Sequence, residues 1–191
     1  MAVAAGRHQL GTDNGRITLR TFRDGLAAQA GHDLTIEAAK WSGELVVGQD
    51  LTPASLSVTV DLGSLVVRRG TGGIKPLSDR DKSEIAVSAR KVLSADRYPE
   101  ATFTATSFEP GPDGAGGIIV GTLMLAGRSQ PQRLQVSQGG PAQYRATTTI
   151  RQTSFGIKPY SAFLGSLKVA DAVEFEAEVD LSQAVEKEPA A

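Results

Sequence analysis

The fold is decided by the stretch VEFEAEVDL at residues 173–181, in which apolar and acidic residues alternate without a break. Val173, Phe175, Ala177, Val179 and Leu181 fall on one face of an extended chain, and the acidic residues between them fall on the other. This period of two is typical of a β-strand with one buried and one solvated face. We therefore expect a strand here that contributes to a hydrophobic interior.

The same alternation recurs along the chain. SLSVTVDL at residues 55–62 places Leu56, Val58, Val60 and Leu62 on one face, and weaker versions lie at residues 16–22, 33–38, 41–47, 101–105, 118–126, 132–136 and 144–151. Turns rich in glycine and proline separate these segments, which favours an antiparallel meander over a parallel sheet. The sequence predicts an all-β protein in which about eight strands close into an antiparallel β-barrel, with a two-sheet sandwich as the alternative.

One long segment, residues 63–99, breaks this pattern. We expect a charged, glycine-rich loop at residues 68–73, followed by a helix at residues 78–93. Ser78 can cap the helix, with Asp81 three residues further on. The helix would cover an open end of the barrel or its outer wall with one apolar stripe, formed by Ile85, Ala89, Val92 and Leu93.

Length and composition limit the remaining possibilities. We expect 191 residues to form one domain, with the barrel at residues 15–182 and flexible tails that lack periodicity at residues 1–10 and 183–191. A formal net charge of −1 gives no basic surface for nucleic acid. The absence of cysteine excludes disulfides and thiolate metal sites. Neither a membrane-spanning stretch nor a secretion signal is evident, so we expect no integral membrane segment and a cytoplasmic location.

Several predicted inward positions carry small side chains, namely Ala38, Ala101, Ala105, Ala146 and Ala177. Small residues leave space along a barrel axis, which would create a cavity. The alternative is that these alanines pack tightly and that the barrel is filled by its own side chains.

Five segments follow one another in a specific order. They are GHDL (31–34) before WSGEL (41–45), the strand at 55–62, DKSEI (81–85) before YPEATF (98–103), VGTLMLAG (120–127), and RQTSFGI (151–157). In this order they resemble the YceI family over residues 15–181. The resemblance implies a lipocalin-like barrel that holds a long apolar lipid of isoprenoid type.

The resemblance and the strand pattern together suggest which residues line such a lipid site. The expected lining consists of aromatic residues and of inward residues of the strand at 33–38 and its neighbour: Phe22, His32, Leu34, Ile36, Trp41, Leu45, Phe103, Phe155, Tyr160, Phe163 and Phe175. Each of these is also compatible with a simple core position. We interpret Trp41 as the floor of the cavity and the irregular stretch at residues 158–168 as a flap over its open end.

Three other residues invite functional interpretations. His32 lies beside Asp33, but neighbouring residues of a strand face opposite ways, and His8 falls in the expected tail. We therefore expect no catalytic or metal site, and we place His32 as a hydrogen-bonded residue or a polar contact at one end of the cavity. Arg151 could contact a lipid head group, although the solvated face of its strand is favoured. Gly156 is expected at a bend with positive φ.

These observations favour non-enzymatic binding of an apolar lipid, for carriage, storage or shielding. No cofactor is expected apart from a bound polyisoprenoid or other long-chain lipid. The alternative is a filled barrel that acts as a stress-related or protein-interaction module without ligand. An enzyme acting on an isoprenoid is a third hypothesis, which lacks the aspartate-rich metal motif common in such enzymes. Barrels of this kind can pair through their outer faces, which allows a homodimer.

Overall fold

The computed structural model describes residues 3–112 and 116–182. Its strands, in chain order, are β1 (Gly6–Gly11), β2 (Gly15–Thr21), β3 (Arg23–Asp24), β4 (His32–Ala38), β5 (Trp41–Val47), β6 (Pro53–Asp61), β7 (Leu65–Gly72), β8 (Glu100–Pro110), β9 (Gly116–Leu125), β10 (Arg128–Gly140), β11 (Gln143–Arg151), β12 (Ser161–Ala162), β13 (Leu167–Val169) and β14 (Ala172–Asp180). The α-helix α1 spans Asp79–Val92. Short 3₁₀ turns lie at Ala28–Ala30, Leu62–Ser64, Gln152–Phe155 and Phe163–Gly165.

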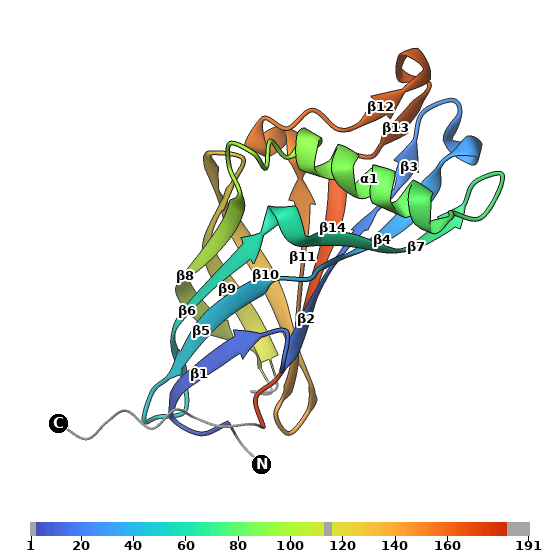
Figure 1. The fold of residues 1–191 in the computed structure, drawn as a ribbon. Helices are drawn as coiled ribbons and strands as arrows, with labels where there is room; N and C mark the ends of the chain where they lie inside the picture. The colour runs from blue at the N-terminus through green and yellow to red at the C-terminus, as the bar shows by residue number, and fades with distance from the viewer. Residues whose placement is uncertain (1–2, 113–115, 183–191) are drawn as a thin grey trace.

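Within the described residues, eleven strands form one antiparallel sheet in the order β1-β5-β6-β8-β9-β10-β11-β14-β2-β4-β7. Figure 1 shows this sheet curling into a tall shell. Hairpins join β5 to β6 and the successive strands from β8 to β11, whereas the other neighbours in the sheet are not consecutive in the chain. The expected antiparallel, lipocalin-like barrel is confirmed. The shell is a half-barrel, because β1 and β7 are the two ends of the sheet and do not pair with each other.

All nine strand segments expected from the sequence are present, as β2, β4, β5, β6, β8, β9, β10, β11 and β14. The sheet has more than about eight strands because β1 and β7 also join it. The prediction of a flexible tail over residues 1–10 is wrong for residues 6–10. They belong to β1, which pairs with β5 and turns His8 and Leu10 into the buried interior. Residues 183–191 lie outside the described residues.

The charged loop predicted at residues 68–73 is also incorrect for most of its length, because Leu65–Gly72 forms β7 beside β4. The register shifts at Arg68, since Ile36 pairs with Val67 whereas Thr35 pairs with Arg69. This bulge interrupts the alternation that the sequence would otherwise show.

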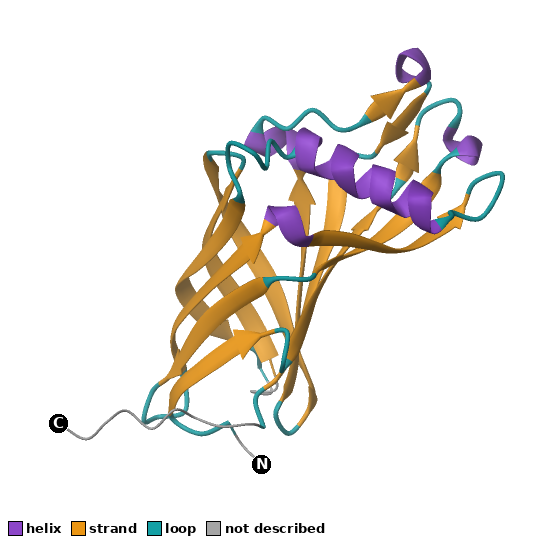
Figure 2. Ribbon diagram, viewed as in Figure 1, coloured by secondary structure: helices purple, strands orange, loops and turns teal. Residues whose placement is uncertain are grey.

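The predicted helix is confirmed as α1. Ser78 is its N-cap and forms a capping box with Asp81. Figure 2 shows the helix lying across one end of the shell, which is the first of the two expected positions. At the same end, β12, β13 and β3 form a small separate sheet, so part of the expected flap at residues 158–168 is regular.

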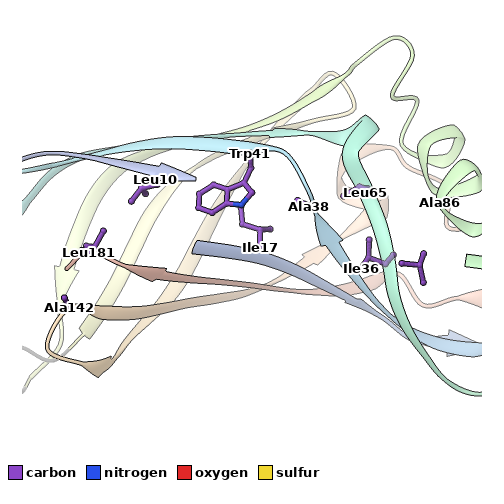
Figure 3. Close-up of a cluster of buried hydrophobic side chains, with 10 residues drawn as sticks. Leu10, Ile17, Ile36, Ala38, Trp41, Leu65, Ala86, Ala142 and Leu181 are labelled. Atoms are coloured by element: carbon purple, nitrogen blue, oxygen red, sulfur yellow. The ribbon is translucent and has the colours of Figure 1, made fainter. Parts of the chain in front are cut away.

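Buried side chains form two clusters. The larger one follows the interior of the shell, and Figure 3 shows Trp41 within it, between Leu10 and Ala38 and near Ile17. The indole of Trp41 also lies against Gly15, where β2 approaches the other half of the curled sheet. The second cluster consists of Leu62, Ala95, Ala101, Leu125, Phe155 and Ile157. The expected bend at Gly156 is confirmed, with φ at 70°.

Candidate functional site

The shell encloses a cavity of about 1300 Å³. Its wall consists of the inward-facing residues of alternating strands. Both clear alternating segments of the sequence line it, with Leu56, Val58, Val60 and Leu62 from one and Val173, Phe175, Ala177, Val179 and Leu181 from the other. A cavity of this size does not fit the alternative in which the interior is filled by its own side chains.

Helix α1 contributes the wall at one end of this cavity. The four residues of the expected apolar stripe, Ile85, Ala89, Val92 and Leu93, all line it. The wall continues along the shell to Leu51 and Pro53, around the turn between β5 and β6. The cavity is therefore elongated along the sheet and reaches from one group of turns to the other.

Eight of the eleven expected lining residues lie in the cavity wall: His32, Leu34, Ile36, Trp41, Leu45, Phe103, Tyr160 and Phe175. The structure thus brings together residues of β4, β5, β8 and β14 with the segment before β12. Trp41 is buried and shares its inward face with Leu45 and Val47.

Three expected residues lie elsewhere. Phe155 is buried in the second cluster, because the 3₁₀ turn after β11 directs it away from the cavity. Phe22 follows the last residue of β2 and is partly exposed, while Phe163 is largely exposed at the turn between β12 and β13. The sequence pattern cannot distinguish these positions, because an aromatic residue near the end of a strand suits a core, a rim or a cavity equally well.

Most of the wall is aliphatic, and the aliphatic lining of several elements was absent from the expected site. Leu10, Ile17 and Leu19 line the cavity from β1 and β2, and Ile119 and Leu123 line it from β9. The alternation in residues 16–22 and 118–126 carries this signal for β2 and β9, whereas Leu10 lies in the segment expected to be a tail. An expectation that favours aromatic residues misses it.

Few polar groups face the cavity. His32 lies at the rim, where its Nε2 is 2.8 Å from the carbonyl oxygen of Lys75. Asp33 points the other way and accepts a hydrogen bond of 2.9 Å from the backbone N–H of Arg23. Gln152 donates to the carbonyl oxygen of Ala170 at 2.9 Å. His32 and Asp33 are therefore held by separate partners, as the strand geometry predicts.

Two polar atoms of cavity-lining residues are buried without a hydrogen-bond partner among the described residues: the indole N–H of Trp41 and the hydroxyl of Thr21. Burial without a partner is unfavourable for such groups. Both atoms are covered by the surrounding protein atoms, so they are not part of the surface that a bound molecule would contact.

Arg151 lies outside the cavity. Its side chain is exposed and approaches Asp171 at 4.0 Å, whereas Tyr144, Ala146, Thr148 and Ile150 of the same strand line the cavity. The expected position on the solvated face is confirmed, and a head-group contact by Arg151 within the cavity is not supported.

Two further observations concern the described part of the chain. It contains no group of three or more histidine, aspartate or glutamate side chains placed to hold a metal ion. None of its helices is long and apolar enough to cross a membrane.

A curled antiparallel sheet around an elongated apolar cavity places the chain in the class of lipocalin-like β-barrels. A family model described as a YceI-like domain matches residues 16–181. The chain belongs to the YceI family.

Solved structures share the fold at low sequence identity. The crystal structure of BcnA from Burkholderia cenocepacia is 17% identical, with a TM-score of 0.64 over 86% of this chain and 94% of that one. A YceI protein from Campylobacter jejuni is 19% identical, with a TM-score of 0.60 over 80% and 85%. A polyisoprenoid-binding domain from Saccharophagus degradans, implicated in plant cell wall breakdown, is 13% identical, with a TM-score of 0.53 over 93% and 99%. The comparison with curated protein sequences gave no match.

Proposed function

We propose that this protein binds a long apolar lipid of isoprenoid type inside its barrel and does not catalyse a reaction. The observation that carries this proposal is the cavity of about 1300 Å³ with a largely aliphatic and aromatic wall. Its volume exceeds the range of roughly 300–1000 Å³ that is usual for small-molecule sites. A long hydrocarbon chain suits such a space better than a compact polar substrate does.

The energetics of burial also support an apolar ligand. Each methylene group removed from water contributes about 0.8 kcal/mol, so a chain of several prenyl units is held without a charged contact. Sequestration of this kind serves carriage, storage or shielding of the lipid.

The relatives agree with this proposal. The chain belongs to the YceI family, and one solved structure with this fold carries the name of a polyisoprenoid-binding domain. Both point to binding rather than to turnover. In the proposed role the bound lipid completes the hydrophobic interior.

Native mass spectrometry of protein purified from its own host tests the proposal. We expect an additional mass that is lost on denaturation and that appears as a long-chain lipid in an organic extract. The second arm mixes delipidated protein with a synthetic polyprenol and measures uptake. Absence of copurified lipid in repeated preparations, together with no uptake of polyprenol, would overturn the proposal and favour a ligand-free interaction module.

A further inference from the structure

Three loops at the end of the shell crossed by α1 expose large apolar side chains. These rim loops are residues 22–31, 70–77 and 158–168. Leu26 and Leu164 are fully exposed, Ile74 is 87% exposed and Phe163 is 72% exposed. Figure 1 shows the three loops projecting at the same end of the molecule, around β3, after β7 and around β12 and β13. Apolar side chains gathered in this way mark an interaction surface.

Hydrogen bonds join the rim loops into one surface. The backbone N–H of Ala27 donates to the carbonyl oxygen of Ser166 at 2.8 Å, and β13 pairs with β3. His32, at the end of the first loop, contacts the carbonyl oxygen of Lys75 in the second. The apolar tips are therefore held on connected loops, not on three independent ones.

The backbone at the tip of the third loop is unusual. Phe163 and Leu164 have φ angles of 50° and 55°, in the left-handed region that side chains larger than glycine seldom adopt. Such residues cluster at functional sites. Here the conformation presents two adjacent apolar side chains to solvent.

Within the rim loops themselves the charges are mostly positive, although Asp79 and Asp81 at the start of α1 lie at the same end and Asp33 is 3.7 Å from Arg23. The rim loops carry Arg23, Lys75, Lys158 and Lys168 against one acidic residue, Asp24. None of the ion pairs among the described residues involves any of the three lysines. At the opposite end of the shell, the turn at residues 48–52 carries Asp50 and no basic residue.

The rim loops also border the cavity. Arg23, Lys75, Tyr160, Leu167 and Lys168 are part of its wall. A surface that combines exposed apolar tips with neighbouring cations matches an anionic bilayer, because the tips enter the acyl region while the cations contact lipid head groups.

We propose that the rim loops dock this protein on the surface of an anionic lipid bilayer. Leu26, Phe163 and Leu164 insert below the head groups, and Lys158 and Lys168 contact the anionic lipid phosphates. Docking brings the cavity mouth to the membrane, and its use for lipid exchange rests on the proposed function. The docking itself does not require a lipid in the cavity.

Vesicle flotation tests this proposal. One set of vesicles contains phosphatidylcholine alone, and the other contains equal parts of phosphatidylcholine and phosphatidylglycerol. We expect the protein to float with the anionic vesicles, with at least about tenfold less bound to the neutral ones, and to be released by about 0.5 M salt. Protein that stays unbound on anionic vesicles at low salt would overturn the proposal.

Two variants separate the apolar and charged contributions. One double variant combines Leu26→Glu with Leu164→Glu, and the other combines Lys158→Gln with Lys168→Gln. Each double variant should bind the anionic vesicles at least about tenfold more weakly than wild type. Both leucines are fully exposed, so folding should be preserved and is checked by circular dichroism. Met124→Glu is the matched control, because Met124 is an exposed apolar residue of β9 outside the cavity wall. Equal flotation of wild type and the double leucine variant would contradict insertion of the tips.

The same samples keep this proposal distinct from the proposed function. The lipid content of each variant is measured by native mass spectrometry alongside flotation. Lipid-loaded protein that does not float with the vesicles overturns docking and leaves lipid binding intact. Empty protein that floats with the vesicles supports docking and counts against lipid binding. Analytical ultracentrifugation tests whether the rim loops bind a second copy of the protein instead of a bilayer. If the wild type self-associates but does not bind vesicles, and the double leucine variant does not self-associate, docking on a bilayer is overturned and the surface is a protein–protein interface.

Discussion

At the residue scale, Gly121 of β9 shows how a missing side chain shapes the cavity wall. A methyl group added at this position would lie 2.5 Å from the carbonyl oxygen of Thr104 and against the ring of Phe103. Phe103 is one of the aromatic residues of the cavity wall, and it packs where only glycine leaves room. The backbone oxygen cannot move aside without disturbing the pairing of β8 with β9.

We predict that Gly121→Ala lowers the free energy of unfolding by about 1–3 kcal/mol, the usual cost of overpacking. Urea denaturation measures this change. Gly139→Ala is the control, because no atom lies within 4 Å of the added methyl group, and it should change stability by less than about 0.5 kcal/mol. A Gly121→Ala variant as stable as wild type would show that Phe103 and β8 adjust freely.

Sequence reasoning at this scale identified which side of a strand faces inward, but not what lies inside. Period-two alternation correctly placed Val58 and Phe175 in the wall. It could not separate Phe103 from Phe155, because both are buried aromatic residues and only their three-dimensional surroundings differ. Phe163 was misplaced for a related reason, since hydrophobicity predicts burial and this side chain is largely exposed.

At the scale of elements, the start of α1 depends on a reciprocal pair of contacts. The backbone N–H of Asp81 donates to the hydroxyl of Ser78 at 3.2 Å, and the backbone N–H of Ser78 donates to the Asp81 carboxylate at 2.9 Å. Hydrogen bonds from Ser78 also lower the pKa of Asp81, which keeps it charged at the positive end of the helix. Both groups were identifiable from the sequence, because a capping box is a local pattern.

Ser78→Ala should cost about 1 kcal/mol of stability, the typical value for loss of an N-cap side chain. Thermal or urea unfolding checks this value. Ser83→Ala serves as the control, since the Ser83 hydroxyl bonds to the carbonyl oxygen of Asp79 within the helix and alanine is the better helix former. If the two variants lose equal stability, the cap has no special role.

The pairing of β7 with β4 includes an ion pair that gives a pH-dependent prediction. Arg68 donates to both carboxylate oxygens of Glu37, at 3.1 and 2.9 Å. The hydrogen bond from Arg68 lowers the pKa of Glu37 from its ordinary value of 4.5. The folded state therefore favours the charged carboxylate. The ion pair stabilises the folded protein at pH values above 4.5, and this stabilisation is lost as the pH falls through the lowered pKa of Glu37.

Glu37→Gln should reduce stability by about 0.5 kcal/mol at neutral pH, because the pair is only partly buried. The difference between wild type and variant should shrink as the pH falls below 4.5 and at high salt. Denaturation curves across this pH range measure it. A difference that grows toward acidic pH would mean that Glu37 acts through another contact.

β1 and β7 explain why the element count exceeded the expectation. In β1 the inward residues are His8 and Leu10, and a histidine does not register as apolar in a pattern search. In β7 the bulge at Arg68 breaks the alternation, and its partner β4 lies some distance away in the chain. Both strands form because they pair with distant parts of the chain, and the local periodicity of the sequence does not indicate such pairing.

At the scale of the whole molecule, the curled sheet and α1 enclose far more space than their own side chains fill. The alanines expected to leave this space are mostly where the sequence placed them, since Ala38, Ala101, Ala146 and Ala177 line the cavity. Ala105 is not part of the wall. The presence of a cavity could be anticipated from these small residues, whereas its volume depends on how strongly the sheet curls, which no local pattern encodes.

Ala146 provides the most direct test of whether this space holds the lipid. It lies on β11, opposite Val136 of β10 and Ala177 of β14, and its side chain faces the cavity. In Ala146→Trp an indole would enter the cavity and occupy part of the space proposed for the ligand. Because room is available there, the variant should fold, and it should carry at least about tenfold less lipid than wild type.

Thr149→Trp is the matched control on the same strand, because Thr149 is exposed and lies outside the cavity wall. Lipid bound per protein is measured by native mass spectrometry for both variants, and circular dichroism confirms that both are folded. A folded Ala146→Trp protein with the full lipid content of wild type would place the ligand outside this part of the barrel. Equal loss in both variants would instead indicate a general effect of the added tryptophan on β11, so only a loss confined to Ala146→Trp assigns the lipid to the interior.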